Sequence, residues 1–271
     1  MTQSIPKPFK RLLLTGASGG LGQLLRVRLK PWTEILRLSD RCDLGPAAPG
    51  EEIVCCDLAD REGVLSMMEG VDAVLHFGGI SVEDRFEPIM QANILGLHHL
   101  YEAVHKAGVK RVVFASSNHA VGFYENTRVI DADMPVRPVG FSGVSNCCGA
   151  ALSRYYHDRF GIETVCIRIG SVLPQPTTRR TMVTWLSQGD FVELLRCSLM
   201  TPRVGHTIVF GSSDNDAKWW DNGKAGHLGF RPRDNARAFA HLFPDTGERP
   251  ADDDLPGKYI GGPFVIHGPQ Y

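Results

Sequence analysis

The stretch that most constrains the fold is RLLLTGASGGLGQLLRVRLK, residues 11–30. Its apolar start, Leu12 to Leu14, is typical of a strand that is buried on both faces. Leucines at helical spacing follow the glycines, and Pro31 ends the predicted helix. A strand, a glycine-rich turn and a helix in this order are the context in which a backbone can cradle a phosphate group.

Gly16, Gly19 and Gly22 give this turn the spacing G-x-x-G-x-x-G. Without Cβ atoms, the turn lets a pyrophosphate approach the helix N-terminus, although a tight turn that binds nothing can show the same spacing. The next predicted strand, residues 35–40, ends in Asp40, where a carboxylate can accept hydrogen bonds from an adenosine ribose. Because a carboxylate repels a 2′-phosphate, Asp40 favours NAD over NADP, while the adjacent Arg41 weakens that preference.

Composition excludes several classes of protein. A chain of 271 residues that is 43% hydrophobic can bury a large core, and its net charge of −1 argues against a nucleic-acid surface. No run approaches the roughly 20 apolar residues of a membrane span, and the first ten residues lack the apolar core of a signal peptide. Seven cysteines without zinc spacing favour buried free thiols, no metal site and a cytoplasmic protein. The sequence leaves a homo-oligomer open.

Strands alternate with helices along most of the chain. Further strands are predicted at 52–57, 73–77, 111–115 and 164–169, with helices at 86–107 and 144–160. This alternation predicts one α/β domain over residues 1–271, with a Rossmann-type, doubly wound parallel sheet of about seven strands. We expect a dinucleotide-binding core over residues 10–171. Residues 172–271 would be mainly a small substrate lobe and a C-terminal tail, with helices at 182–187 and 191–199, a strand at 206–210, and a surface segment at 257–271.

Ligands of such sheets bind beyond the carboxyl ends of the strands, where polar and glycine-rich clusters fall in this chain. The residues that we expect to contact NAD are Gly16, Ser18, Gly19, Gly20, Leu21, Gly22, Asp40, Asp57, Leu58, Phe77, Gly78, Gly79, Asn93 and Ile169. Asp57 has an alternative role, since it could equally cap the helix that begins near Asp60.

Nine stretches carry a family resemblance, and they span nearly the whole chain: TGASGGLG, LRLSD, CDLAD, LHFGGIS, QANILG, FASSNHAVGFY, RIGSVLPQP, RRTMVTWLS and WWDN. With them the chain resembles the extended short-chain dehydrogenase/reductase superfamily, and within it the uronate dehydrogenases. The resemblance implies oxidation of the C1 hydroxyl of a cyclic uronic acid with NAD, giving an aldarolactone. It also implies a sugar-acid site lined by Ser81, Ser117, Asn118, His119, Ser171 and Arg180.

The chemistry of these side chains suits a sugar acid. Arg180 can bind a carboxylate bidentately, and the serines and Asn118 can bond ring hydroxyls. For Arg179 we prefer a solvated loop. His119 could instead be a core histidine whose ring is satisfied internally.

The chain departs from the superfamily at the general base. That base is a tyrosine, and a lysine four residues later lowers its pKa and holds the cofactor ribose. In FSGVSNCC, residues 141–148, Ser142 stands at the tyrosine position and Asn146 at the lysine position. A serine is a poor base at neutral pH, and an asparagine brings no charge. Because general base catalysis contributes about 10²–10⁴-fold, we expect slow dehydrogenation with cofactor and sugar binding retained.

Three interpretations stay open. The chain is a slow or rewired sugar-acid dehydrogenase, with His119 or a water relay taking the proton; or it uses NAD for elimination, epimerisation or dehydration of a related acid; or it is a non-catalytic NAD(H)-binding sensor or partner subunit. The catalytic candidates are Ser117, His119, Ser142 and Asn146. An engineered inactive variant is conceivable, but the neighbouring Cys147-Cys148 and Gly149-Ala150 indicate broad drift.

Overall fold

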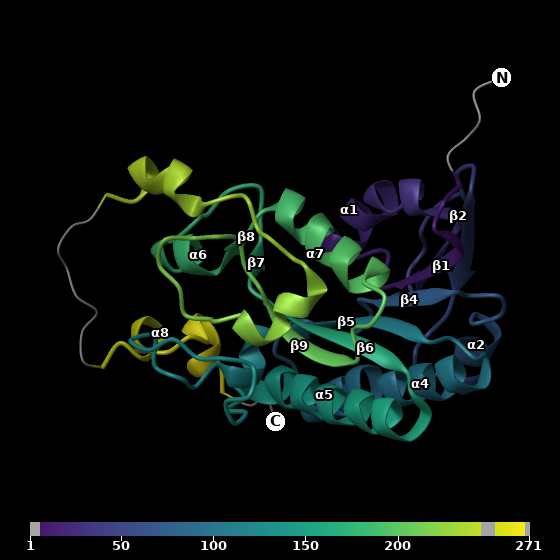
Figure 1. The fold of residues 1–271 in the computed structure, drawn as a ribbon. Helices are drawn as coiled ribbons and strands as arrows, with labels where there is room; N and C mark the ends of the chain where they lie inside the picture. The colour runs from purple at the N-terminus through teal and green to yellow at the C-terminus, as the bar shows by residue number, and fades with distance from the viewer. Residues whose placement is uncertain (1–5, 245–252, 269–271) are drawn as a thin grey trace.

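The computed structural model describes residues 6–244 and 253–268. Its centre is a seven-stranded parallel sheet in the order β3-β2-β1-β4-β5-β6-β9 (Figure 1). The strands are β1 (Phe9–Thr15), β2 (Thr33–Asp40), β3 (Glu51–Cys55), β4 (Ala73–His76), β5 (Arg111–Ser117), β6 (Glu163–Ile169) and β9 (His206–Gly211). The strand order reverses direction between β1 and β4, which is the point where such sheets open a crevice for a ligand.

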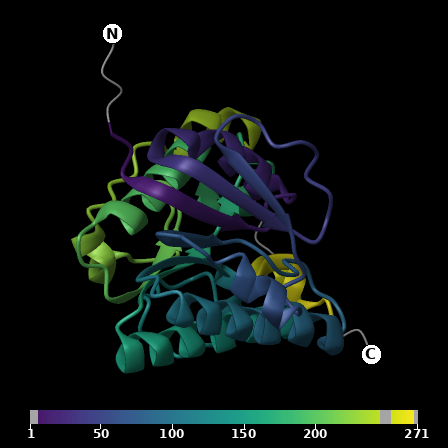
Figure 2. The same cartoon turned by 90° about the vertical axis from the view of Figure 1, so that its right-hand side faces the viewer.

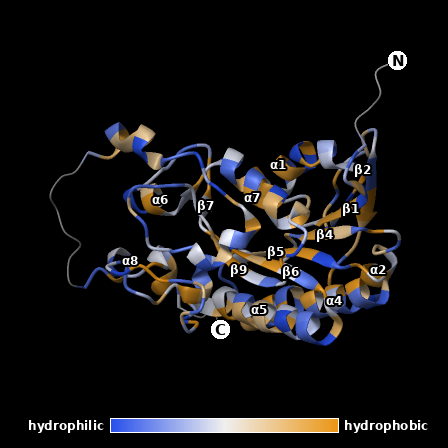
Figure 3. Ribbon diagram, viewed as in Figure 1, coloured by the Kyte–Doolittle hydropathy of each residue, from blue (hydrophilic) through white to orange (hydrophobic). Residues whose placement is uncertain are grey.

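Helices cover both faces of the sheet (Figure 2). One face carries α1 (Gly20–Arg28) and α7 (Gln188–Met200), and the other carries α2 (Arg61–Ser66), α4 (Gly96–Lys106) and α5 (Gly140–Phe160). The leucines of β1 explain this layering, because Leu12 and Leu14 pack toward the first set of helices and Leu13 toward the second, all of them fully buried. Figure 3 shows the apolar colour concentrated in these strands. The predicted doubly wound parallel fold is confirmed.

Smaller elements complete the fold, and several of them lie beyond the carboxyl ends of the strands (Figure 1). They are α3 (Phe86–Ile89), α6 (Arg179–Thr184), α8 (Leu255–Lys258), a π-helix (Met90–Leu95), a small sheet of β7 (Ser171–Val172) and β8 (Trp185–Leu186), and the 3₁₀ turns Lys30–Trp32, Asn118–Val121, Gly223–Leu228, Ala236–Leu242 and Gly262–Val265. A third apolar cluster joins this region, and it includes Tyr124, Trp220 and Ile260. None of the helices in the described part of the chain is long and apolar enough to cross a membrane.

Several predicted boundaries are corrected. The helix predicted over 86–107 is present over residues 86–106, but its middle part, Met90–Leu95, is a π-helix between α3 and α4. α6 begins before residue 182, because Thr178 caps it in a reciprocal bond with Thr181, and residues 185–186 form β8 instead. β9 lies in the segment that we assigned mainly to the substrate lobe, yet it completes the main sheet. The division of the chain at residue 171 stays a prediction.

The cysteines are all free, but burial was predicted too broadly, because Cys42, Cys55 and Cys148 are exposed.

The predicted surface segment at 257–271 is described to residue 268, and residues 269–271 lie outside the described part. Within it, Ile260 is fully buried and bonds through its amide to the carbonyl of Tyr124. Residues 260–262 are therefore part of the packed interior, while residues 266–268 lie on the surface as predicted.

Candidate active site

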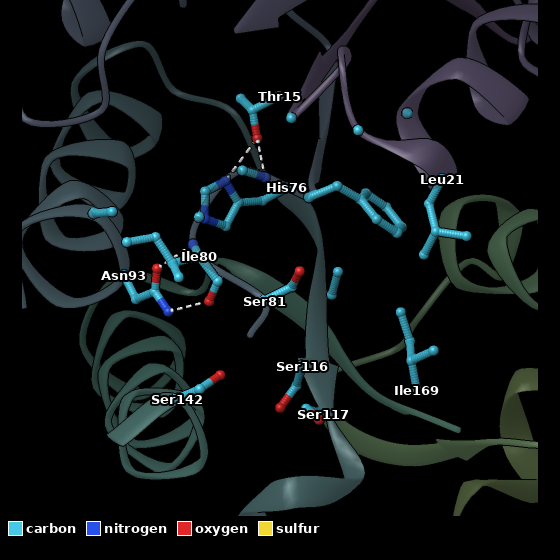
Figure 4. Close-up of a pocket in the computed structure, with 18 of the residues that line it drawn as sticks. Thr15, Leu21, His76, Ile80, Ser81, Asn93, Ser116, Ser117, Ser142 and Ile169 are labelled. Carbon is cyan, nitrogen blue, oxygen red and sulfur yellow. Dashed lines mark hydrogen bonds between the residues drawn. The ribbon is translucent and has the colours of Figure 1, made fainter. Parts of the chain in front are cut away.

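A cavity of about 650 Å³ opens along the carboxyl ends of the central strands, and it is lined by every residue that the sequence predicted for the cofactor, the substrate or catalysis. Their individual roles remain predictions. Figure 4 shows part of the lining, with Leu21 and Ile169 on one side of an open space and Ser142 on the other.

The glycine turn forms one end of this cavity. Gly16 adopts φ +72°, and a Cβ there would lie 2.3 Å from the carbonyl oxygen of Phe77. A Cβ on Gly22 would lie 2.2 Å from the carbonyl oxygen of Gly16, whereas one on Gly20 would meet nothing within 4 Å. The turn thus packs tightly against the protein but leaves space on the cavity side. No side chain caps the N-terminus of α1, so its first amides are available to a diphosphate.

Asp40 stands beside the turn at the end of β2. Its Oδ2 accepts from the amide of Ser18 at 3.0 Å, and its Oδ1 accepts from the amide of Cys42 at 3.1 Å. Burial alone would raise the pKa of Asp40, but the hydrogen bonds from these amides outweigh it and hold the pKa below its usual value. Asp40 is therefore ionised at neutral pH, with lone pairs left for ribose hydroxyls. These observations fit the adenosine diphosphate half of NAD.

Asp57 and Leu58 also line this end. The helix cap that we left open for Asp57 belongs to Asp60, whose side chain accepts from the amide of Gly63. Asp57 instead accepts from the amide of Ala59 at 2.8 Å. Its predicted place at the cofactor is therefore free of a competing capping role.

A buried pair shapes the floor of the cavity. Thr15 Oγ1 lies 2.8 Å from Nδ1 of His76 and also accepts from the amide of Gly78 at 3.2 Å. Burial lowers the pKa of His76 to about 4, so the ring is neutral at pH 7. This contact fixes the start of the loop that leaves β4, where Gly78 and Gly79 allow a close approach to the backbone.

Asn93 holds the next part of that loop from the π-helix. Its Oδ1 accepts from the amide of Ile80 at 2.7 Å, and its Nδ2 donates to the carbonyl of Ile80 at 2.9 Å (Figure 4). Nδ2 also donates to Ser145 Oγ at 3.0 Å. Asn93 thus links the β4 loop to α5. A π-helix often marks a functional position, because the widened turn redirects its side chains.

The far end of the cavity carries Arg180 and His119. Arg180 donates through Nη2 to the carbonyl of Ile260 at 2.6 Å, its Nε is buried without a partner, and its guanidinium lies 5.9 Å from the ring of Trp219. His119 packs 4.0 Å from the ring of Phe264. Burial, and then the charge of Arg180, lowers the pKa of His119 to about 4. Its Nδ1 is also buried without a partner.

The two hydroxyls nearest this end are constrained differently. Ser117 Oγ accepts from the amide of His119 at 3.1 Å and donates to Oδ1 of Asn118 at 3.4 Å. Ser171 Oγ shares a 2.9 Å hydrogen bond with Thr184 Oγ1. A guanidinium, a neutral imidazole and several hydroxyls in one cavity form a set suited to a hydroxylated acid.

Ser142 and Asn146 occupy the first turns of α5. Ser142 is 2% exposed, and its hydroxyl points from α5 toward the space that Ser81 and Ser116 border (Figure 4). Asn146 Nδ2 donates to the carbonyl of Ser142 at 2.9 Å. Its amide group is therefore bound to its own helix, and neither side chain supplies a base or a positive charge.

Some lining residues escaped the sequence interpretation. Thr15, Ser116 and Phe264 line the cavity, as does His76. Thr15 and Ser116 directly adjoin residues that we singled out, so their positions at the ends of strands could have revealed them. Phe264 is brought in from the other end of the chain, and no local pattern marks it.

Comparisons with known proteins agree with this geometry. Residues 12–187 match the model of the NAD dependent epimerase/dehydratase family. The chain is 53% identical over 263 residues to a uronate dehydrogenase of Pseudomonas putida, covering 97% of this chain and 98% of that protein. It is 50% identical to a uronate dehydrogenase of Agrobacterium fabrum, covering 94% of this chain and 97% of the other.

Solved structures give the same result. The crystal structure of uronate dehydrogenase from Agrobacterium tumefaciens is similar with a TM-score of 0.91 and 49% identity, over 95% of this chain and 97% of that chain. A tyrosine-to-alanine mutant of the same enzyme, complexed with NAD, is similar with a TM-score of 0.93, over 97% of this chain and 99% of the other.

Proposed function

Because the chain belongs to the NAD dependent epimerase/dehydratase family, as a uronate dehydrogenase-like member, we propose that it binds NAD and oxidises the C1 hydroxyl of a uronate-like sugar acid to a lactone. One observation carries the proposal: a single cavity joins the glycine turn and Asp40 at one end to Arg180 and His119 at the other. The two ends suit the two partners of a hydride transfer.

The residues at one end of the cavity would bind the cofactor, and those at the other end would bind the sugar acid. The amides at the start of α1 would hold the diphosphate and Asp40 the ribose, while bound NAD supplies the hydride acceptor. Arg180 would hold the carboxylate of the acid. The hydroxyls of Ser81 and Ser117 would orient the sugar ring.

The step for which the site lacks a strong base is removal of the proton from the C1 hydroxyl. His119 is the first candidate, since its Nδ1 is buried without a partner and its neutral ring can accept a proton. With a pKa of about 4 it is a weak base. A water bound near Ser142 is the alternative acceptor. Either route supports a slow enzyme.

A second candidate function is binding of NAD(H) without turnover. The presence of Ser142 and Asn146 at the positions of the base and its partner favours it. A chain that lacks the base and its partner could act as an NAD(H) sensor or a partner subunit. NAD-assisted epimerisation, dehydration or elimination on a related acid is the remaining possibility. We include in the proposal a cytoplasmic location, which the free cysteines support. Assembly into a homo-oligomer stays open.

The test is a titration with NAD and glucuronate followed by product analysis. We expect both to bind and a lactone to form slowly with one NADH per acid. Binding without any product would favour the sensor, and a product formed without net NADH would favour the epimerase or dehydratase. Failure of glucuronate to bind in the presence of either cofactor form would overturn the assignment.

The cofactor assignment is tested separately with Asp40→Ala. Loss of the carboxylate should weaken NAD binding about tenfold or more, since it removes a charged acceptor, and should weaken NADP binding less. Calorimetry with the two cofactors measures the ratio. Tighter binding of NADP than of NAD by the unmodified protein would contradict the role of Asp40.

A further inference from the structure

We propose that Glu83 is a positioning residue that fastens the β4 loop, residues 77–85, to the first turn of α5 and thereby sets the place of Ser81 in the acid site. The inference rests on the proposed function, because it concerns how the substrate end of that site is held. Glu83 does not line the cavity, and its carboxylate contacts the site only through backbone amides of α5.

The contact is made with backbone amides of α5. Glu83 Oε1 accepts from the amide of Phe141 at 2.7 Å, and Oε2 accepts from the amide of Ser142 at 3.2 Å. The residue before the helix, Val139, offers no side-chain cap. A carboxylate at the N-terminus of this 21-residue helix accepts hydrogen bonds from two otherwise unpaired amides. Its negative charge also interacts favourably with the positive end of the helix dipole.

The local backbone is adapted to this carboxylate. Gly140 adopts φ +67°, a conformation that side-chain-bearing residues rarely take. A Cβ at that position would lie 2.0 Å from Oε2 of Glu83. Next to this hydrogen-bonded contact, the rings of Phe86 and Phe141 pack edge to face, with 5.3 Å between their centroids. The glycine thus leaves the space that the carboxylate fills.

The loop has a second attachment on the other side of Ser81. Asn93 bonds both the amide and the carbonyl of Ile80, and it also donates to Ser145 of α5. Ser81 therefore lies between two points, Ile80 and Glu83, that are both tied to α5. Removing Glu83 leaves Ser81 held from one side only, next to the turn that carries Ser142.

The first measurement is the dissociation constant of glucuronate in the presence of NADH, where no turnover occurs. We expect Glu83→Ala to weaken glucuronate binding about tenfold, because Ser81 loses one of its two attachments, and to leave the NADH dissociation constant unchanged. Glu83→Gln, which keeps one acceptor, should fall between Ala and the unmodified protein. Glu87→Ala is the matched control, because Glu87 is an exposed carboxylate on the adjacent α3.

Equal losses of glucuronate and NADH affinity would indicate general damage and overturn the proposal, as would unchanged glucuronate binding in Glu83→Ala. Hydrogen exchange gives a readout that does not depend on the substrate. The amides of residues 80–83 and 141–142 should exchange at least tenfold faster in Glu83→Ala, while those of β1 should not change. If the unmodified protein fails to bind glucuronate, the proposed function fails, and unchanged exchange in the variant would separately refute the role of Glu83.

Discussion

At the scale of single residues, we expect Ser142 and Asn146 to limit the rate of the proposed reaction, because neither supplies a base or a positive charge. Changing both, as Ser142→Tyr with Asn146→Lys, should create or strongly raise uronate-dependent NADH formation. The increase should be about 10²–10⁴-fold, the usual contribution of a general base. Both changes are needed, because a tyrosine without a neighbouring cation keeps a pKa near 10 and is mostly protonated at pH 7.

Initial rates of NADH formation measure this effect, and Ser142→Tyr alone is the control. If the unmodified protein already reduces NAD rapidly with glucuronate, another residue is the base. His119→Ala should then eliminate the activity.

At the same scale, we predict that Arg180 binds the carboxylate of the acid. Arg180→Ala should abolish the thermal stabilisation that glucuronate provides and leave the stabilisation by NAD intact, because the guanidinium is the cation at the far end of the cavity. Arg179→Ala is the matched control, since Arg179 is an exposed neighbour on the same helix. Unchanged acid binding in Arg180→Ala would remove Arg180 from the site.

At the scale of elements, the β1–α1 turn should respond differently to substitution of two of its glycines. Gly22→Ala places a Cβ 2.2 Å from the carbonyl oxygen of Gly16, so the turn must shift. We expect a loss of stability of about 1–3 kcal/mol together with weaker NAD binding. Gly20→Ala meets open space and should keep the stability. Denaturant unfolding and calorimetry compare the two, and equal stability of both variants would show that the turn tolerates the shift.

Elements with strong local patterns could be predicted, and those set by distant contacts could not. The β1 leucines, the glycines and the alternating strands identified the sheet because their periodicity reflects burial on both faces. The π-helix at Met90–Leu95 was not predicted, because an apolar helical pattern does not reveal an extra residue in one turn. The start of α5 was placed four residues late, since its cap is Glu83, far away in sequence.

At the scale of the whole molecule, buried neutral histidines make stability depend on pH. Burial lowers the pKa of His76 from 6.5 to about 4. Below pH 6.5 the unfolded chain binds a proton that the folded chain refuses, so stability is fully present above pH 6.5 and falls as pH drops toward 4. The shift corresponds to about 3 kcal/mol. Unfolding at a series of pH values should show this slope. His76→Gln should make the slope shallower without removing it, because burial also lowers the pKa of His119 and of His206 to about 4. An equal slope in both proteins would contradict the burial effect.

In the candidate site too, residues marked by local sequence motifs could be predicted, whereas residues brought in by distant contacts could not. The motifs after β1, β2, β4, β5 and β6 placed the predicted residues in one cavity, because parallel strands all end at one edge of a sheet. Phe264 and the carbonyl of Ile260 reach the site by a return of the chain that no local pattern encodes. The local motifs therefore predicted much of the lining that comes from the strand ends and missed the part that residues 260–264 contribute.

Residues 260–264, near the end of the chain, contact His119 and Arg180, and this contact has a consequence for biosynthesis. A ribosome releases the glycine turn and Asp40 long before Phe264, so a nascent chain can assemble its dinucleotide end while the acid end still lacks a wall. NAD in the surroundings would then stabilise the sheet by mass action before any sugar acid could be recognised.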